Sequence, residues 1–292
     1  MSNTNLQKIT GKTRMLCLLG DPVEHSQSPL MHNTACRLLD LDYAYLAFQV
    51  TIDNLPRAVE GLKLLGARGW NLTMPLKNAM VPLVDELTDA ARLSGSVNTV
   101  INDNGRLIGH TTDGIGFMDS AKDAGYDLVK KDLVLLGAGG AASSIVVQAA
   151  LDGVAAIHVF KRKNASWSST EQFLSHIQAE TGCVITLEDI HDEHALSQRI
   201  GNTNLLVNAT NVGMAPDVDV SPVNEKLLYP ELPVCDIIYN PMQTKLLRDA
   251  AAIGCPTFNG LYMLLYQGAA SFEAWTGHEM PVEEIKKTLF TK

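Results

Sequence analysis

Two hydroxyl groups in the first half of the chain stand where they could hold a carboxylate. Ser26 and Ser28 lie in a polar segment, Gly20–Asn33, that follows a short apolar run. Ser28-Pro29 is typical of a helix N-cap followed by the first helical residue. Capping explains Ser28 alone and does not require Ser26. The pair therefore predicts an anion site at a helix N-terminus, where backbone N–H groups also favour negative charge.

A lysine with an unusual position comes next. Lys77 ends the segment Asn71–Lys77 and falls two residues after Pro75, in the first turn of a predicted helix. The helix dipole disfavours a cation at that position. Two interpretations stay open: an amine placed to exchange a proton, and a surface lysine that costs about a few tenths of a kcal/mol.

A carboxylate and an amide complete this group of candidates. Asp113 stands at the junction of a predicted strand and a predicted helix, where capping alone would explain it. Asn98 offers an amide on the neighbouring strand. With Lys77, these residues could orient a hydroxyl group and exchange its proton.

The clearest motif lies in the second half of the chain. The apolar run Leu133–Leu136 leads into the glycine-rich segment Gly137–Ala142, and a helix follows. Gly137 permits the tight turn, Gly139 allows a pyrophosphate to approach the backbone, and Ala142 is small enough for helix–strand packing. This context predicts dinucleotide binding; the alternative is a Rossmann-like domain that has lost its ligand.

A basic segment refines the dinucleotide prediction. The next predicted strand, Ile157–Phe160, ends in Lys161, Arg162, Lys163 and Asn164. NAD-specific sites usually carry an acidic residue there. Arginine suits a phosphate better, so the segment favours NADP and leaves NAD open. A solvated basic loop is the alternative interpretation.

Alternating elements must position these residues. Short apolar runs alternate with amphipathic stretches, which indicates βαβ units and a mostly parallel sheet. Val97–Asn102 and Arg106–His110 flank a turn signal and predict an antiparallel hairpin. The predicted strands are Met15–Leu19, Tyr43–Val50, Gly69–Thr73, Leu133–Leu136, Ala156–Phe160, Val184–Leu187, Leu205–Asn208 and Val234–Ile238. The predicted helices are Leu55–Leu65, Ala79–Leu93, Ile115–Ala124, Ala141–Leu151, Thr170–Glu180, Thr244–Ile253, Leu261–Ala274 and Val282–Phe290.

The pattern divides the chain into two α/β domains. We expect residues 1–113 to form a substrate-binding and catalytic domain and residues 114–259 a doubly wound, Rossmann-type NAD(P)-binding domain. The helices of residues 260–292 are expected to pack back on the first domain. A length of 292 residues suits two domains.

Composition excludes several classes of protein. The chain is 46% hydrophobic and 19% charged, which fits a globular protein. Its net charge of −9 argues against nucleic-acid and anionic-membrane partners, and an anionic ligand would need local donors. The five cysteines are widely spaced and predict reduced thiols, not a metal site or disulfides. No signal peptide or membrane span is visible, so a cytoplasmic enzyme is expected.

Taken together, the motifs resemble the shikimate dehydrogenase family over essentially the whole chain. The matching stretches are His25–Pro29, Asn71–Lys77, Val97–Thr99, Thr112–Gly116, Gly137–Ala142, Asn208–Met214, Tyr239–Pro241, Thr244–Leu247 and Gly260–Ala269.

The resemblance implies a role for each candidate residue. Ser26 and Ser28 would hold a substrate carboxylate, and Lys77 with Asp113 would form the catalytic pair. Ring hydroxyls would be bound by Thr73, Asn98, Asp113 and Gln267. The cofactor would be bound by Gly137, Ala138, Gly139, Gly140, Ala141, Lys161, Arg162, Lys163, Thr210, Met214, Tyr239, Gly260 and Met263.

The likeness is greatest to the bacterial quinate/shikimate subgroup, which uses either substrate and either NAD or NADP. It implies reversible hydride transfer between shikimate and 3-dehydroshikimate, and between quinate and 3-dehydroquinate, in the chorismate pathway of aromatic amino acid biosynthesis. Asn164 replaces an acidic residue of the subgroup, which weakens the case for NAD. Tyr262 replaces a glycine beside the nicotinamide pocket and is expected to narrow that pocket. Three alternatives stay open: a strict NADP enzyme, an aminoshikimate-type enzyme, and a non-catalytic NAD(P)- and metabolite-binding regulator. The oligomeric state stays open between monomer and homodimer.

Overall fold

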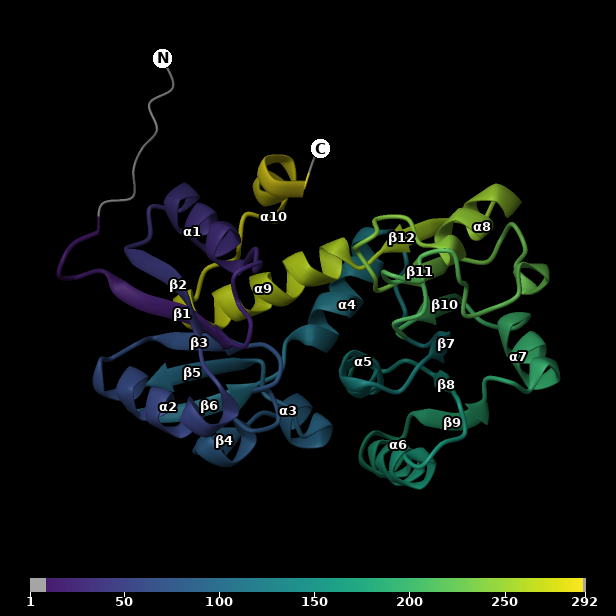
Figure 1. The fold of residues 1–292 in the computed structure, drawn as a ribbon, viewed down its shortest axis with the longest axis horizontal. Coiled ribbons are helices and arrows are strands. Elements are labelled where there is room, and N and C mark those ends of the chain that lie inside the picture. The colour runs from purple at the N-terminus through teal and green to yellow at the C-terminus, as the bar shows by residue number, and fades with distance from the viewer. Residues whose placement is uncertain (1–8, 291–292) are drawn as a thin grey trace, which may run out of the picture. The chain divides into compact units, whose positions relative to one another are not determined.

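The computed structural model describes residues 9–290, which form two compact units (Figure 1). Unit 1 comprises residues 9–112 and 265–290, and unit 2 comprises residues 113–264. Each unit is built around its own six-stranded sheet. The α/β fold class expected from the alternating sequence pattern is therefore confirmed.

Unit 1 contains a mixed sheet with strand order β2-β1-β3-β5-β6-β4. β1 is parallel to β2 and β3, whereas β5 is antiparallel to β3 and β6. The predicted hairpin is confirmed as the β5–β6 pair. The strands are β1 (Arg14–Gly20), β2 (Tyr43–Gln49), β3 (Gly69–Leu72), β4 (Glu86–Leu87), β5 (Thr99–Asp103) and β6 (Arg106–His110).

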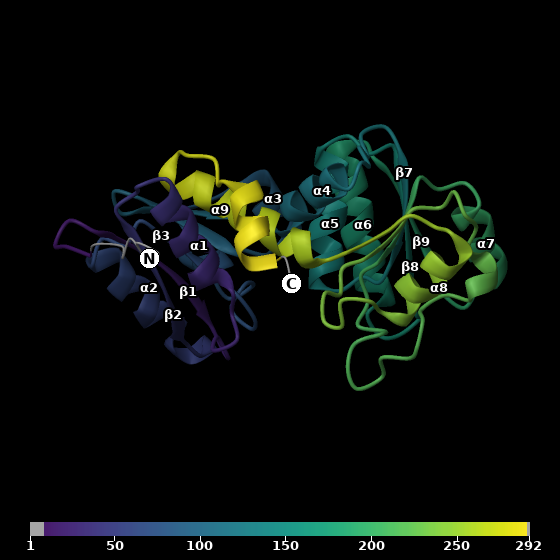
Figure 2. The same ribbon diagram turned by 90° about the horizontal axis from the view of Figure 1, so that it is seen from above.

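Helices cover both faces of this sheet (Figures 1 and 2). One face packs an apolar core with α2, in which Leu55, Val59 and Leu62 meet Trp70 and Leu72 of β3. The other face carries α1 and α9, so polar residues of α9 reach the sheet from the far end of the sequence. The helices of unit 1 are α1 (Ser28–Leu38), α2 (Leu55–Leu64), α3 (Asp89–Ser94), α9 (Leu261–Thr276, which starts in unit 2) and α10 (Val282–Ile285), followed by a π-helical turn (Lys286–Phe290).

The helix predicted over Ala79–Leu93 is wrong. The segment forms a 3-10 turn (Val81–Leu83), the short strand β4 and only then α3. Pro82 lacks the N–H that an α-helix needs. Asp85 pairs with Leu107 at the start of β6, accepting its N–H on the carboxylate at 2.7 Å. Cross-strand pairing therefore overrides the apolar periodicity.

Unit 2 contains a fully parallel sheet with strand order β12-β11-β10-β7-β8-β9. Numbered from β7, this is the 3-2-1-4-5-6 order of a doubly wound dinucleotide-binding sheet. The strands are β7 (Asp132–Leu136), β8 (Ala156–Lys161), β9 (Val184–Asp189), β10 (Leu205–Asn208), β11 (Val234–Asp236) and β12 (Thr257–Asn259).

Helices lie on both faces of the parallel sheet (Figures 1 and 2). α4, α5 and α6 cover one face, and α7 and α8 cover the other with Leu196, Ile200, Leu246 and Leu247 in the core. The helices are α4 (Asp113–Asp123), α5 (Gly140–Leu151), α6 (Trp167–Thr181), α7 (Glu193–Ile200) and α8 (Lys245–Ile253). The carboxyl ends of the strands thus meet at one edge, where ligands of such sheets bind.

Candidate active site

The glycine turn of unit 2 has the geometry of a pyrophosphate site. Gly137 adopts φ +107°, and a Cβ there would lie 2.8 Å from the carbonyl oxygen of Ala209. Gly139 is the N-cap of α5, and no side chain caps the helix. A Cβ on Gly139 or Gly140 would meet no atom within 4 Å. The first turn of α5 therefore presents its N–H groups to open space, which fits a dinucleotide pyrophosphate.

A cavity of about 600 Å³ opens beside this turn. Its lining joins the glycine turn to the end of β8 and to the loop after β10, as a dinucleotide site requires. The lining includes Gly137, Gly139, Arg162, Asn164, His191 and Thr210.

The three basic residues after β8 have different surroundings. Lys161 is only 8% exposed, and its ammonium donates to the hydroxyls of Ser166 (2.8 Å) and Thr170 (2.9 Å). The ammonium of Lys163 lies 5.5 Å from the centre of the Trp167 ring, a cation–π contact. Arg162 is exposed and lines the cavity. Of the three, Arg162 is the residue with a side chain available for a 2′-phosphate.

His191 is a cavity residue that the sequence-based candidates did not include. It is exposed and follows β9, the strand adjacent to β8. The signal was available, because residues just after neighbouring parallel strands share one edge of the sheet.

The predicted nicotinamide-side residues are spread over several loops of unit 2. Thr210 lines the cavity, whereas Met214 and Tyr239 are 45% and 46% exposed and do not line it. A side chain at Gly260 would overlap the carbonyl of Ile237. Met263 is half-buried in the first turn of α9.

In unit 1 the two predicted carboxylate-binding serines lie together. α1 begins at Ser28 with Pro29 in its first turn, and Gln27 is the N-cap, so the predicted cap position of Ser28 is wrong by one residue. The hydroxyl of Ser26 accepts the backbone N–H of Ser28 at 3.2 Å. The hydroxyl of Ser26 therefore satisfies one of the N-terminal N–H groups of α1.

Lys77 lies in a loop and not in a helix, which corrects the expectation from its sequence position. Residues 74–80 form turns after β3. The loop is held at both ends, since Thr73 donates its N–H to Leu19 (2.9 Å) and the carbonyl of Lys77 accepts the N–H of Val97 (3.0 Å). No helix dipole therefore acts against Lys77, which lies half-buried in the loop that follows β3.

The remaining substrate-side candidates border a buried hydrogen-bond network. Asn98 is 2% exposed; its amide donates to the hydroxyl of Thr112 at 3.1 Å and its oxygen accepts the N–H of Thr112 at 2.9 Å. Asp113 follows Thr112 directly and starts α4 in unit 2, where the helix dipole stabilises a carboxylate. Gln267 lies in α9, and its carbonyl accepts the hydroxyl of Ser271.

We call the buried network of unit 1 the neutral network: Tyr45, Asn71, Asn98, Thr99, Thr112 and Ser271. Tyr45 donates its hydroxyl to Asn71 at 2.8 Å, and Asn71 donates to Thr99 at 3.0 Å and to Ser271 at 3.1 Å. Burial raises the pKa of Tyr45 well above its usual value, so the network stays uncharged. Sequence reasoning missed Tyr45 and Ser271, which carry no motif signal of their own.

His32 lies beside the neutral network and is fully buried. Its ring stacks on Tyr45 with centroids 4.4 Å apart and lies 5.4 Å from Trp275. Neither ring nitrogen has a hydrogen-bond partner among the described residues. Burial lowers the pKa of His32 to about 3, so the imidazole is neutral at physiological pH.

Between residues 9 and 290, no group of three or more His, Cys, Asp and Glu side chains is arranged to hold a metal ion. No helix of the same range has the length and apolar character needed to cross a membrane.

Comparisons with known proteins agree with this arrangement. Residues 18–100 match the shikimate dehydrogenase substrate binding domain, and residues 260–290 match the shikimate 5′-dehydrogenase C-terminal domain. Over 291 residues the chain is 45% identical to a protein of Listeria monocytogenes serotype 4b named shikimate dehydrogenase (NADP(+)), covering 99% of this chain and 100% of the relative. The chain belongs to the shikimate dehydrogenase family.

Solved structures of the family have the same fold. The shikimate 5-dehydrogenase of Listeria monocytogenes, in complex with shikimate and NAD, superposes with a TM-score of 0.94 at 45% identity, over 99% of this chain and 100% of that one. The quinate dehydrogenase of Corynebacterium glutamicum, in complex with NAD, gives 0.84 at 28% identity, over 95% and 99%. The family resemblance drawn from the motifs is confirmed.

Proposed function

We propose that the protein is an NADP-dependent shikimate dehydrogenase, which interconverts shikimate and 3-dehydroshikimate by hydride transfer. The observation that carries the proposal is the 45% identity, over nearly the full length of both chains, to a relative of that name. In this proposal unit 1 binds the substrate and unit 2 binds the dinucleotide.

Unit 2 supports the cofactor half of the proposal. The turn at Gly137 and Gly139 would hold the pyrophosphate, and Arg162 would pair with the 2′-phosphate of NADP. The Asn164 side chain accepts the N–H and the hydroxyl of Ser166. Because it is an uncharged amide, it adds no negative charge near that phosphate. NAD use belongs to the proposal as a weaker second activity, since a carboxylate for the ribose is missing at position 164.

Unit 1 supports the substrate half. Ser26 and Ser28 at the start of α1 would hold the carboxylate of shikimate, a role for which hydroxyls beside a helix N-terminus are suited. The ring hydroxyls would be bound by Thr73, Asn98, Asp113 and Gln267. Quinate carries the same carboxylate on a saturated ring, and we propose it as a second substrate. A similar protein, from Corynebacterium glutamicum, is named quinate dehydrogenase.

Lys77 and Asp113 are the proposed proton-handling pair. The bound dinucleotide supplies the hydride acceptor. During oxidation the Lys77 amine accepts the proton of the reacting hydroxyl, and during reduction it returns that proton. The Asp113 carboxylate accepts a hydrogen bond that orients the hydroxyl.

The direct test is the absorbance of reduced nicotinamide with shikimate or quinate and NADP⁺ or NAD⁺, in all four combinations. Shikimate with NADP⁺ is expected to give the highest kcat/KM. Binding of both ligands without any turnover would favour the non-catalytic regulator and overturn the proposal.

Lys77→Ala is the sharpest single variant for this reaction. The loss of a positioned acid–base group should lower kcat by about 10²- to 10⁴-fold, with KM for shikimate changed by only a few fold. Lys63→Ala is the matched control, because Lys63 lies in the same unit, half-exposed and 3.9 Å from Asp85. An unchanged kcat in Lys77→Ala would remove this residue from the mechanism.

Two glycine variants test the pyrophosphate site independently of turnover. Gly137→Ala forces a side chain into a left-handed backbone and against Ala209, which should cost about 1–3 kcal/mol of unfolding free energy. Gly139→Ala has room and a negative φ, so its stability should stay within about 0.5 kcal/mol of wild type. Its methyl group nevertheless enters the space of the pyrophosphate and should weaken NADP⁺ binding about tenfold or more, measured by calorimetry. Wild-type NADP⁺ affinity in Gly139→Ala would contradict the site.

A further inference from the structure

Unit 2 contains a fully buried carboxylate that is connected by hydrogen bonds to the loop lining the cavity. Asp236 ends β11 and has no exposed surface. It accepts three hydrogen bonds, from the Thr244 hydroxyl (2.7 Å), the Asn208 amide (3.1 Å) and the Ile238 N–H (3.0 Å). No Lys or Arg of the described chain forms an ion pair with it. Burying a carboxylate without a cation beside it costs folding free energy, so a functional reason for Asp236 is worth seeking.

The carboxylate acts on the orientation of the Asn208 side chain, together with the Val212 carbonyl, which accepts from the same NH2 group at 3.3 Å. A carboxylate can only accept, so the NH2 end of the amide must face Asp236. The oxygen end of Asn208 then accepts the N–H of Thr210 at 3.0 Å and its hydroxyl at 2.7 Å. A flipped amide would set oxygen against carboxylate and NH2 against the Thr210 N–H, so one orientation is strongly favoured.

Asn208 is connected to the cavity through Thr210, which it holds by two hydrogen bonds and which lines the cavity. The Thr210 hydroxyl also accepts the N–H of Val212 at 3.1 Å, which closes the loop after β10. Ala209, Thr210 and Val212 line the 600 Å³ cavity. The same loop packs on the glycine turn, since a Cβ at Gly137 would lie 3.0 Å from the Thr210 methyl group.

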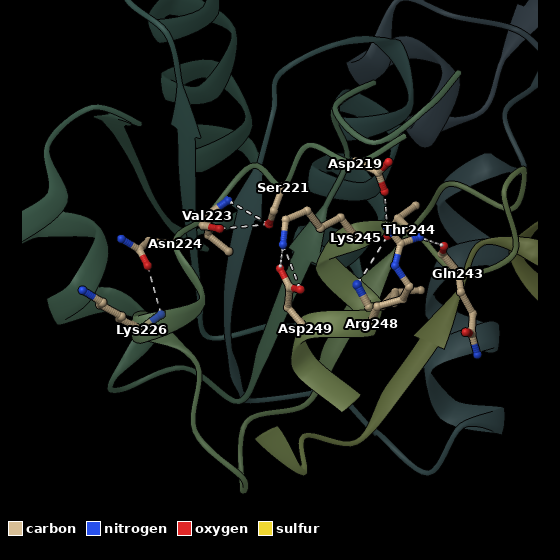
Figure 3. Close-up of polar contacts among 11 residues, drawn as sticks. Asp219, Ser221, Val223, Asn224, Lys226, Gln243, Thr244, Lys245, Arg248 and Asp249 are labelled. Carbon is tan, nitrogen blue, oxygen red and sulfur yellow. Dashed lines mark hydrogen bonds and ion pairs between the residues drawn. The ribbon is translucent and has the colours of Figure 1, made fainter. Parts of the chain in front are cut away.

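The second carboxylate oxygen is anchored by a different element. Thr244 donates to Asp236 and caps α8 by accepting the Leu247 N–H at 3.4 Å. Figure 3 shows Thr244 at the start of α8, near the Arg248–Asp219 ion pair of 2.7 Å. This oxygen, Oδ2 of Asp236, is hydrogen-bonded to the N-cap of α8 and not to the Asn208–Thr210 pair. The two oxygens of Asp236 therefore have separable roles.

We propose that Asp236 is a positioning residue for the dinucleotide: it sets the orientation of the Asn208 amide and thereby holds Thr210 and the loop 209–212 in the shape that accepts the cofactor. The inference rests on the proposed function, because it takes the cavity beside Gly137 as the cofactor site.

The test is a double-mutant cycle read out as the Kd for NADP⁺ on the full-length protein. Asp236→Leu and Asn208→Ala should each raise this Kd about tenfold, and the double variant should raise it no further, because both remove the same relay. Asp236→Asn keeps an acceptor oxygen facing Asn208 and should stay within about twofold of wild type. Additive effects of the two substitutions would overturn the relay.

Thr244→Val is the matched control, because it removes a partner of the same carboxylate on the α8 side. It should lower the thermal stability and leave the Kd for NADP⁺ within about twofold. If Asp236→Leu does not fold, Asn208→Ala and Thr244→Val decide: equal effects of these two on the Kd would overturn the proposal. If wild type binds no NADP⁺, the proposed function fails; if wild type binds and the variants match it, only the positioning role fails.

Discussion

The two units bury polar side chains in different ways. The neutral network of unit 1 is made of hydroxyls and amides, which can reverse donor and acceptor roles when neighbours rotate. In unit 2 the hydrogen bonds around the fully buried Asp236 end on a carboxylate, which accepts and does not donate. The neutral network adds rigidity without charge, whereas the carboxylate of unit 2 fixes the direction of each hydrogen bond around it.

Two buried groups, one in each unit, also respond differently to pH. In unit 1 a titratable group beside the network is His32, whose pKa burial lowers to about 3. In unit 2 burial raises the pKa of Asp236, and the hydrogen bonds from Thr244, Asn208 and Ile238 oppose that shift. The contribution of His32 to stability is therefore lost toward acid, and the contribution of Asp236 is lost as its carboxylate ionises.

The largest effect is expected where the neutral network is broken at its centre. Asn71→Ala removes the partner of Tyr45 and a donor to Thr99 and Ser271, and should cost about 3 kcal/mol of unfolding free energy. Because every member is uncharged, this cost should be the same at pH 6 and pH 8 in urea unfolding. Asn54→Ala, which loses one exposed hydrogen bond to Thr51, is the control. A cost that changes with pH would contradict the neutral character.

A smaller effect is expected for His32 at acid pH. The unfolded histidine binds a proton below pH 6.5, whereas the folded one stays neutral down to about pH 3. The contribution of His32 to stability is therefore fully present above pH 6.5. It is lost as the pH falls, by about 2–3 kcal/mol at pH 4.5. His32→Phe keeps a ring on Tyr45 and should flatten this loss between pH 7 and 4.5. His176→Phe, on the exposed side of α6, should keep the wild-type profile; equal profiles for both variants would refute the assignment.

The smallest effect, with the opposite sign, is expected for Asp236. Its raised folded pKa means that the protonated form is favoured on folding, so its contribution is present below the unfolded value of 3.8 and is lost as pH rises through the folded pKa. Wild type should therefore lose stability relative to Asp236→Asn when the pH is raised from 4 to 7, by about 1.4 kcal/mol for each unit by which the pKa is raised. A difference that is independent of pH would show that burial does not perturb this carboxylate.

Local patterns predicted most of the fold and part of the site. The glycine turn at Gly137 and the strand β7 before it follow from apolar runs and backbone freedom, which act within a few residues. The helix over Ala79–Leu93 was mispredicted because the pairing of Asp85 with Leu107 joins residues distant in sequence. The expected position of Lys77 failed for the same reason.

Sequence by itself determined the alternation of strands and helices, the glycine turn, and the family to which the motifs belong. Only the tertiary structure decided that Lys161 is hydrogen-bonded to Ser166, and that Arg162 and His191 line the same cavity. The reason is physical: propensity and spacing act over a few residues, whereas burial and hydrogen-bond partners join Asn71 to Ser271, which are 200 positions apart. The charge state of His32 and of Asp236 depends on that burial.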